Sequence, residues 1–376
     1  MSATLLIARR NATRSRIRFA AATAGVALAL TLTLALDAIY AGVADQLTTY
    51  IDRAGADVWV SQAGVRNLHM VASWLPDTTT DLVRAVDGVA EASPILYATD
   101  TIAAGDERAV AYVIGLPAGA RMGGPWAVVQ GSDIVGRGGI VVDRGFAGRA
   151  RITIGDPITV LGGEARVTGL SEGTASLTNS VAFVSFDDFQ AMRGGAQVVS
   201  FVLVKTARGA SPDAVAAAIE RTVPSVAARS TGAFAAEERR LVTDMSGDVI
   251  AIMNAIGFAV GLAVVALTVY VATLARRREF GVLKALGASN VSLYLVVIDQ
   301  ALLSVALGFL VGLALTVLLG VVVTLAGTGL ELSITLGSLV KVASFALVIA
   351  GLSAILPVRQ VAGLDPAMVF RRGATA

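Results

Sequence analysis

The sequence predicts an α-helical membrane protein with four transmembrane helices, in which an α+β extracytoplasmic domain separates the first helix from the other three. Composition is the first observation behind this prediction. Of the 376 residues, 55% are hydrophobic and 15% are charged, and the mean hydropathy is +0.73, whereas soluble domains carry about 25% charged residues. The second observation is the spacing of apolar segments that reach the roughly 20 residues needed to cross a bilayer core.

Four segments meet that length. The first, 17–36, has its only charge, Arg18, at the edge, and the second (249–275) and third (301–326) are uncharged. The fourth, 339–357, contains Lys341 near one end, where a lysine can extend its ammonium group to the interface. A cleaved signal peptide is the alternative for the first segment. Signal peptides have an apolar region of about 7–15 residues, which is shorter than this one.

The distribution of charge orients the four spans. Basic residues collect in three places, and placing all three on the cytoplasmic side satisfies the positive-inside rule. They are Arg9, Arg10, Arg14, Arg16 and Arg18 before the first span, Arg276, Arg277, Arg278 and Lys284 after the second, and Arg359, Arg371 and Arg372 after the fourth. Both termini are then cytoplasmic, and we expect a multi-pass protein of the cell membrane with an acidic domain outside.

The predicted boundaries follow from these segments. They are a cytoplasmic amphipathic N-terminal segment (1–16), helix one (17–40), the extracytoplasmic domain (41–245), helix two (246–275), a short cytoplasmic helix (276–290), helix three (291–326), an outer loop (327–338), helix four (339–358) and a cytoplasmic tail (359–376).

Short strand-like runs separated by glycine-rich turns dominate the extracytoplasmic domain. We expect strands at 57–62, 109–116, 139–143, 156–161, 180–186 and 198–205, and helices at 78–88, 186–192 and 211–223. The last helix begins with Ser211, Pro212 and Asp213, residues that are typical of a helix start. Residues 233–249 are expected to form a helix that runs directly into the second span.

Several classes of chemistry lack their sequence signatures. The chain has no cysteine and one histidine, His69, so it has no thiolate metal site, no disulfide and no site with several histidines. It also lacks a phosphate-binding loop, a G-x-S-x-G elbow and an H-E-x-x-H motif. We expect no enzyme activity, cofactor or metal in this chain and no nucleic-acid partner. The acidic pairs 106–107, 187–188 and 237–238 are expected on the solvated surface, and His69 in the core or at the surface.

The segment RRREFGVLKALGAS (276–289) combines basic residues, one acid and a compact apolar face at helical spacing. Gly287 is expected to end this helix. The segment can be a positively charged loop that rests on the membrane, or a helix that docks into a groove of a partner protein.

This segment resembles the R-x-R-E-[IF]-[GA]-[VI]-[LF]-[RK]-A-[LI]-G signature of the MacB/FtsX-type ABC transporter permeases. The end of the chain, LPVRQVAGLDPAMVFR, resembles the ending of the same family, with Val369 and Phe370 in place of the usual Ala-Leu. In span three, QALLSVALG has Gln300 where the family commonly has Glu, and Asp299 precedes it. GADVWV and GIVVDRGFAGRARITIGDPITVLGGEARVTGL resemble the MacB-like periplasmic core domain, so the resemblance covers nearly the whole chain.

The resemblance implies a permease subunit driven by a separate ATPase. Two permease chains, expected as a homodimer, pair with two ATPase subunits that bind ATP and Mg²⁺. The segment 276–290 becomes the coupling helix, and the residues expected to contact the ATPase are Arg276, Arg278, Glu279, Phe280, Leu283, Lys284, Leu286 and Gly287. ATP-driven closure moves the first two spans, and the stalk around 234–249 carries the motion outward.

The family implies a hydrophobic or amphipathic substrate, such as a lipid, lipoprotein, haem or drug, and contact with membrane lipids. Two other interpretations stay open. One is an FtsX-like transducer that activates an extracytoplasmic partner protein, and the other is a membrane-anchored sensor or enzyme without an ATPase.

Polar residues lie near the outer ends of the first two spans, where charge is less costly than at the bilayer centre. They are Asp37, Tyr40, Asp248 and Asn254. We expect an amphipathic ligand to place its polar head against these groups. The alternative is that they are interfacial residues solvated by water.

Overall fold

A computed structural model describes residues 16–174, 180–275, 277–326 and 330–362. Four of its helices are long and apolar enough to cross a membrane, at Thr23–Arg53, Gly247–Ala275, Asn290–Leu325 and Leu336–Arg359. One precedes and three follow an α+β extracytoplasmic domain, which confirms the predicted fold class. The N-terminal segment 1–15, Arg276 and the C-terminal motif beyond 362 lie outside the described residues.

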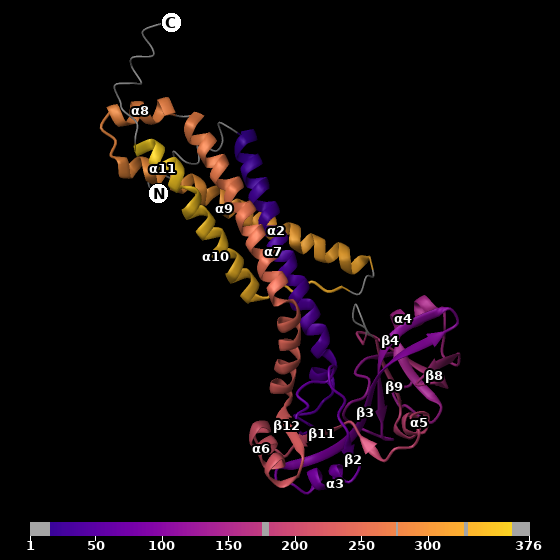
Figure 1. The fold of residues 1–376 in the computed structure, drawn as a ribbon. Coiled ribbons are helices and arrows are strands. Elements are labelled where there is room, and N and C mark those ends of the chain that lie inside the picture. Colours follow the sequence, from indigo (N-terminus) through magenta and orange to yellow (C-terminus); the bar gives the residue numbers. More distant parts are fainter. Residues whose placement is uncertain (1–15, 175–179, 276, 327–329, 363–376) are drawn as a thin grey trace. The chain divides into compact units, whose positions relative to one another are not determined.

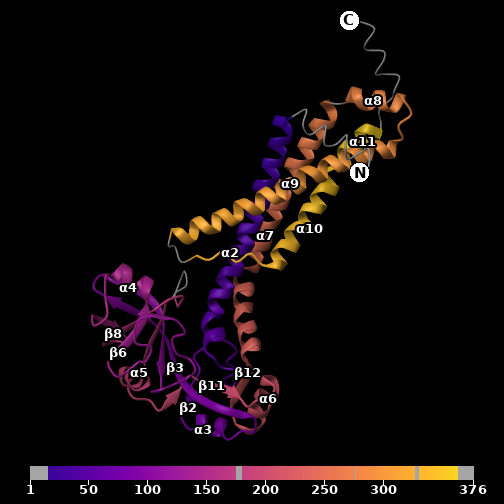
Figure 2. The same cartoon turned by 180° about the vertical axis from the view of Figure 1, so that it is seen from behind.

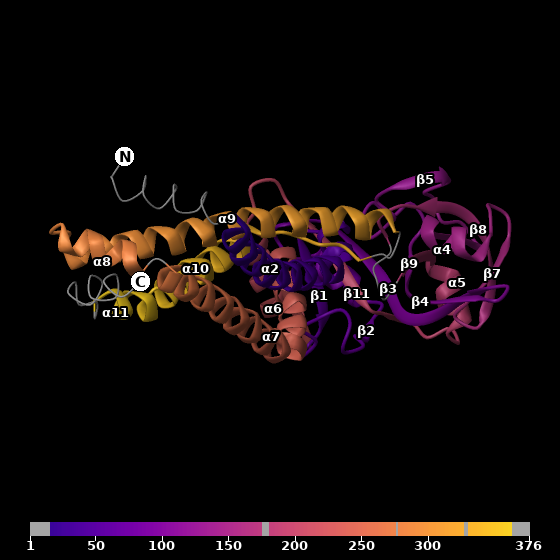
Figure 3. The same cartoon turned by 90° about the horizontal axis from the view of Figure 1, so that it is seen from above.

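The chain separates into two compact units: a membrane unit and an ectodomain, the latter formed mainly by residues within 43–245. The helices of the membrane unit, some of which extend beyond it, are α2 (Arg16–Arg53), α7 (Thr231–Ala275), α8 (Arg277–Ala285), α9 (Asn290–Leu325), α10 (Leu336–Ser353) and α11 (Ile355–Ala362). Figures 1 and 3 place the short helices α8 and α11 at the same end of this unit.

Glycines allow the long helices to approach closely, as in many membrane bundles. A Cβ atom on Gly308 of α9 would lie 2.5 Å from Cγ1 of Val26 on α2, and one on Gly312 would lie 3.0 Å from the carbonyl oxygen of Ala27. On α7, a Cβ on Gly257 would lie 2.7 Å from the hydroxyl oxygen of Thr33. Helix α2 therefore packs between α7 and α9, and it runs beside α7 in Figures 1 and 2.

We expect Gly308→Val to destabilise the membrane unit by about 1–3 kcal/mol, because overpacking a tight contact displaces its neighbours. Gly351→Val is the matched control, since a Cβ at Gly351 meets no atom within 4 Å. Thermal unfolding of the two purified variants in detergent measures the difference. Equal midpoints for both variants would show that the α2–α9 contact is loose.

The ectodomain contains one large sheet and one small sheet. The strands are β1 (Val58–Gln62), β2 (Leu75–Pro76), β3 (Val89–Ala104), β4 (Glu107–Leu116), β5 (Val128–Gly131), β6 (Gly139–Asp143), β7 (Pro157–Val160), β8 (Gly163–Ser171), β9 (Ser180–Ser185), β10 (Val198–Val199), β11 (Phe201–Thr206) and β12 (Val226–Ser230). The large sheet has the order β12-β1-β11-β3-β4-β9-β6-β8-β5, and β10 pairs with β2 in the small one.

Strand β7 pairs with both β3 and β8, so the pairings β3-β4-β9-β6-β8-β7 close into a ring. Two short helices, α4 (Arg144–Ala150) and α5 (Phe186–Met192), contribute Phe146 and Phe189 to the apolar core of this ring. Outside the ring, β5 pairs with β8, and strands β12, β1 and β11 carry α3 (Thr79–Arg84) and α6 (Pro212–Thr222) over a second core. Strand β3 belongs both to the ring and to the strands of the second core, because its first part pairs with β11 and its second part pairs with β4.

Each predicted strand and helix of this domain corresponds to an observed element. Ser211 is the N-cap of α6 with Pro212 in the first turn, as predicted, although the Ser211 side chain makes no capping hydrogen bond. The predicted helix at 233–249 is part of α7, a single helix from Thr231 to Ala275. The predicted strands omit β2, β3, β5, β8 and β12, and the predicted helices omit α4. Of these, β3 contains Pro94 and has an irregular burial pattern, which hides the period-two signal of a strand.

Candidate functional site

Helix α8 contains most of the segment that the sequence singled out. Arg276 and the side chain of Arg278 lie outside what the structure describes. Gly287 adopts a φ of 91°, a left-handed conformation that glycine takes without strain. Its N–H donates to the carbonyl of Lys284 and that of Ala288 donates to the carbonyl of Leu283, so the predicted helix end is confirmed.

The apolar residues of this segment do not form one free face. Phe280 is 5% exposed and packs in the core of the membrane unit with residues of α2, α7, α9 and α10. Leu283 is partly buried against the same core, whereas Leu286 is 80% exposed. The expectation that Phe280, Leu283 and Leu286 together meet a partner is therefore corrected: Phe280 holds the segment onto the spans.

The face that stays accessible contains Glu279, Val282 and Leu286, which are all exposed. Positions i, i+3 and i+7 share one side of a helix. Lys284 is half-buried. The segment thus has an inner side that packs on the spans and an outer side with one acid and two apolar residues.

A second polar site lies among the membrane helices. Oδ1 of Asp37 on α2 accepts hydrogen bonds from Nζ of Lys341 on α10 at 3.0 Å and from Nδ2 of Asn254 on α7 at 3.2 Å. The Asp37 side chain is 8% exposed and that of Lys341 is 41% exposed. One carboxylate therefore links three of the four long helices.

This geometry contradicts the alternative that water solvates Asp37, because its side chain is 8% exposed and accepts hydrogen bonds from Lys341 and Asn254. The ammonium group of Lys341 is directed to Asp37, although its side chain stays 41% exposed. Of the other residues expected at this site, Asp248 is exposed and Tyr40 is half-buried. Lys341 is the one charge in its span, but nothing in the sequence beside it indicates that it pairs with Asp37.

We expect Lys341→Met to destabilise the protein by about 3 kcal/mol, since it leaves the buried Asp37 carboxylate without its counter-charge. Asp37→Asn alone should also be destabilising. The double variant should recover much of the loss, with a coupling energy of about 1–3 kcal/mol between the two sites. Unfolding midpoints of the three variants in detergent complete the cycle, and strictly additive effects would mean that the ion pair contributes no stability.

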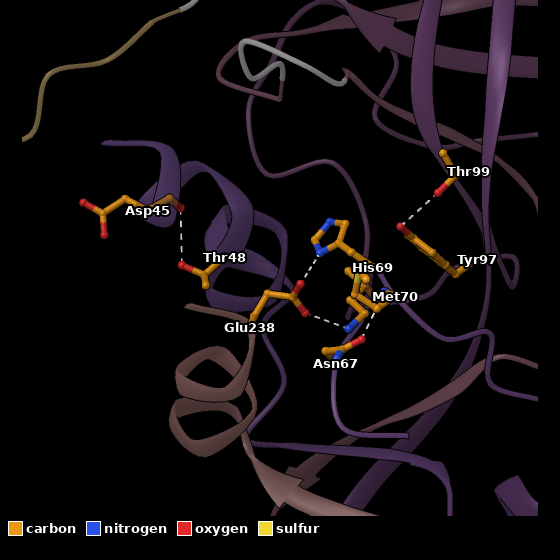
Figure 4. A network of polar contacts seen from close by, with 9 residues as sticks. Asp45, Thr48, Asn67, His69, Met70, Tyr97, Thr99 and Glu238 are labelled. Atoms are coloured by element: carbon orange, nitrogen blue, oxygen red, sulfur yellow. Dashed lines mark hydrogen bonds and ion pairs between the residues drawn. The ribbon is translucent and has the colours of Figure 1, made fainter. Parts of the chain in front are cut away.

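A third polar network lies in the ectodomain (Figure 4). Glu238 of α7 has a side chain that is 0% exposed. Its Oε1 lies 2.5 Å from Nδ1 of His69, and its Oε2 accepts a hydrogen bond of 2.7 Å from the N–H of Leu68. The expectation that both acids of the pair 237–238 are on the solvated surface is wrong for Glu238. Its neighbour Glu237 instead pairs with Arg229 and Arg240.

Two tyrosine rings, those of Tyr97 and Tyr112, pack against the ring of His69. The rings of His69 and Tyr112 have centroids 4.5 Å apart, and those of Tyr97 and Tyr112 are 5.7 Å apart. Burial raises the pKa of Tyr112 to about 12, and the negative charge of Glu238 adds to the rise. Among the described residues, no group of three or more His, Cys, Asp or Glu side chains is placed to hold a metal ion.

Comparison with protein-family models gives two matches. Residues 19–222 match the MacB-like periplasmic core domain, and residues 251–366 match the FtsX-like permease C-terminal domain. No curated protein matches the chain.

Two solved structures resemble part of this chain. One is the extracellular domain of the noncanonic ABC-type transporter YknZ from Gram-positive bacteria, at 14% identity and a TM-score of 0.38, covering 46% of this chain and 100% of that one. The other is the periplasmic region of MacB from Actinobacillus actinomycetemcomitans, at 9% identity and a TM-score of 0.38, covering 48% of this chain and 90% of that one.

Proposed function

Because this chain belongs to the MacB/FtsX-type ABC transporter permeases, we propose that it converts ATP hydrolysis by a separate ATPase into movement of its ectodomain, and thereby exports a hydrophobic or amphipathic substrate. An ABC permease implies an ATPase partner, and the permease family carries no ATPase domain of its own. The proposal rests mainly on helix α7. Its N-terminal end is fixed in the ectodomain core, and its C-terminal end is followed directly by α8.

Helix α7 is 45 residues long, or about 68 Å at 1.5 Å per residue, more than twice the thickness of a bilayer core. Its first two turns contribute Phe234 and Ala235 to the ectodomain core. Its last turns contribute Val265 and Val269 to the core of the membrane unit, which also contains Phe280 of α8. A displacement of α8 therefore acts on the same packed core that holds α7.

The outer side of α8 supports the second part of the proposal. Glu279, Val282 and Leu286 offer an anchor for a groove on a partner, because an apolar residue that fills a pocket typically contributes most of the energy of a small interface. We propose that this side meets the ATPase, in which ATP and Mg²⁺ are bound. Two permease chains and two ATPase subunits then form the complex in the cell membrane, with both termini of this chain cytoplasmic.

An FtsX-like transducer is the second candidate function. It uses the same α8 contact and the same two anchored helices, but the moving ectodomain activates an extracytoplasmic protein instead of handling a substrate. Stimulation of the ATPase by a lipid-like compound favours the exporter, and stimulation by a protein partner alone favours the transducer.

We expect Leu286→Asp to detach the ATPase while the permease stays folded, because Leu286 is 80% exposed and packs on nothing in this chain's core. Loss of an interface anchor typically costs about 2 kcal/mol or more, which weakens binding roughly thirtyfold. Affinity purification of the tagged chain from its native membranes, with ATPase activity measured in the eluate, tests this.

Leu325→Asp is the control for that experiment, since Leu325 is 83% exposed and lies at the opposite end of α9 from α8. The control should retain the ATPase. Full recovery of ATPase with Leu286→Asp would show that α8 is only a loop on the membrane surface.

We also propose that substrate approaches the outer ends of α2 and α7, near Tyr40 and Asp248. Asp37 and Asn254 are the other two residues of this proposed site. Asp37 accepts hydrogen bonds from both Asn254 and Lys341, and Asp37 and Asn254 are both buried, so they are less accessible to a substrate than Tyr40 and Asp248.

A photo-crosslinking amino acid at Asp248 should capture an alkyne-bearing phospholipid to a different extent with and without trapped ATP, because movement of α7 changes what its exposed side meets. The same amino acid at Leu347 of α10, which is 64% exposed, should capture lipid equally in both states. Equal capture in the two states at both positions would argue against this access route.

A further inference from the structure

The ectodomain contains a cavity of about 370 Å³ that none of the proposed transport machinery uses. Two segments form much of its wall: residues 68–74, and the stretch from α5 to β10. Residues 96–99 of strand β3 and Ser200 complete the named lining. The volume falls within the range of small-molecule sites, which are mostly apolar with a few fixed polar groups.

Residues 68–74 expose large apolar side chains although the backbone is held in place. Met70 is 60% exposed, Val71 is 50% exposed and Trp74 is 61% exposed. Hydrogen bonds nevertheless fix this segment, from the N–H of Met70 to Asn67, of Leu68 to Glu238, and of Trp74 to the side chain of Gln62. Exposed apolar side chains on a segment whose backbone is already held in place indicate a binding surface.

The polar groups of the cavity define the ligand further. Arg193 and His69 line it, and none of the described lining residues is acidic. Glu238, the carboxylate that bonds to His69, is 0% exposed and lies behind the ring. Arg193 is exposed, so its guanidinium group can meet a charge that stays near water. A guanidinium group forms strong, often bidentate hydrogen bonds with carboxylate and phosphate.

From these observations we infer that the ectodomain cavity binds an amphipathic anion, an apolar chain with one acidic head group such as a long-chain fatty acid. The chain lies against Trp74, Met70 and Val198, and the head group meets Arg193. His69, held by Glu238, forms part of the wall. Binding at this site does not depend on the ATPase. That an exported substrate binds here during transport rests on the proposed function.

The test uses the full chain in lipid nanodiscs and a long-chain fatty acid that carries a diazirine and an alkyne, with the corresponding alcohol as the uncharged probe. Mass spectrometry maps the labelled peptides. We expect saturable labelling of 68–74 and 189–200 by the acid, with the alcohol about tenfold weaker because it lacks the charge-assisted contact.

Variants on both walls separate binding from folding. Ala196→Trp and Thr99→Trp fill the cavity from exposed positions, and each should abolish ectodomain labelling. Gln197→Trp, whose site is also exposed but does not line the cavity, should leave it intact. Arg193→Gln should reduce labelling by the acid to the level of the alcohol, whereas Arg208→Gln, an exposed arginine elsewhere, should not.

Three results would overturn the inference: labelling confined to the membrane helices, labelling that persists in both cavity-filling variants, or equal labelling by acid and alcohol. The Leu286→Asp variant should still bind the acid probe. Loss of the ATPase contact and loss of ligand binding are therefore separate outcomes, and failure of the proposed function leaves this test unaffected.

Discussion

The proposed mechanism depends on one packing arrangement, the aromatic core in which both α2 and α7 are fixed to the ectodomain. The rings of Phe234 on α7 and Trp59 on β1 stack with centroids 5.2 Å apart and an interplanar angle of 11°. Tyr50 on α2 meets the same Trp59 edge-on at 5.9 Å. Aromatic pairs of this kind contribute about 0.5–1.5 kcal/mol each beyond the area that they bury. Two helices that continue into membrane spans thus share one rigid anchor.

In the membrane unit, the Asp37–Lys341 ion pair holds helices together, as the aromatic core does in the ectodomain. Lipid supplies no hydrophobic force between helices, so association depends on close packing and on polar contacts. Glycines provide the close packing of α2 against α7 and α9. Asp37 adds a directional contact to α7 and α10, and a carboxylate in this setting is tolerated because Lys341 neutralises it. Four helices are thereby joined through α2.

Much of the fold could be predicted because it depends on local or compositional signals. Span length and Gly287 each report on a short stretch of chain, and these two predictions agree with the described structure. The orientation that the charge distribution predicts stays a prediction. The missed features are contacts between distant residues. Glu238 stands in the run EERR, which is typical of a solvated helix, and nothing near it in the sequence indicates a histidine 169 residues away.

The same limit applies to the candidate sites. The apolar face of α8 was visible in the sequence, but helical spacing cannot distinguish a side that packs on its own protein from one that meets a partner. Only the burial of Phe280 and the exposure of Leu286 separate the two. The sequence does contain a signal for the Asp37–Lys341 pair, because an unpaired charge in an apolar segment costs free energy and two opposite charges can remove that cost by pairing. The signal is seen only when the charges of different spans are compared.

His69 joins the ectodomain cavity to one of the helices that continue into the membrane. Its ring lines the cavity, while its Nδ1 atom bonds to Glu238 on α7. A shift of the ring must either break this bond, leaving a fully buried carboxylate short of a partner, or move Glu238 with it. Breaking the bond is unfavourable, because the free energy lost when a buried charge is left unsatisfied exceeds the free energy that one hydrogen bond contributes. Since thermodynamic coupling between two sites is reciprocal, a movement of α7 that displaces Glu238 also alters the cavity wall.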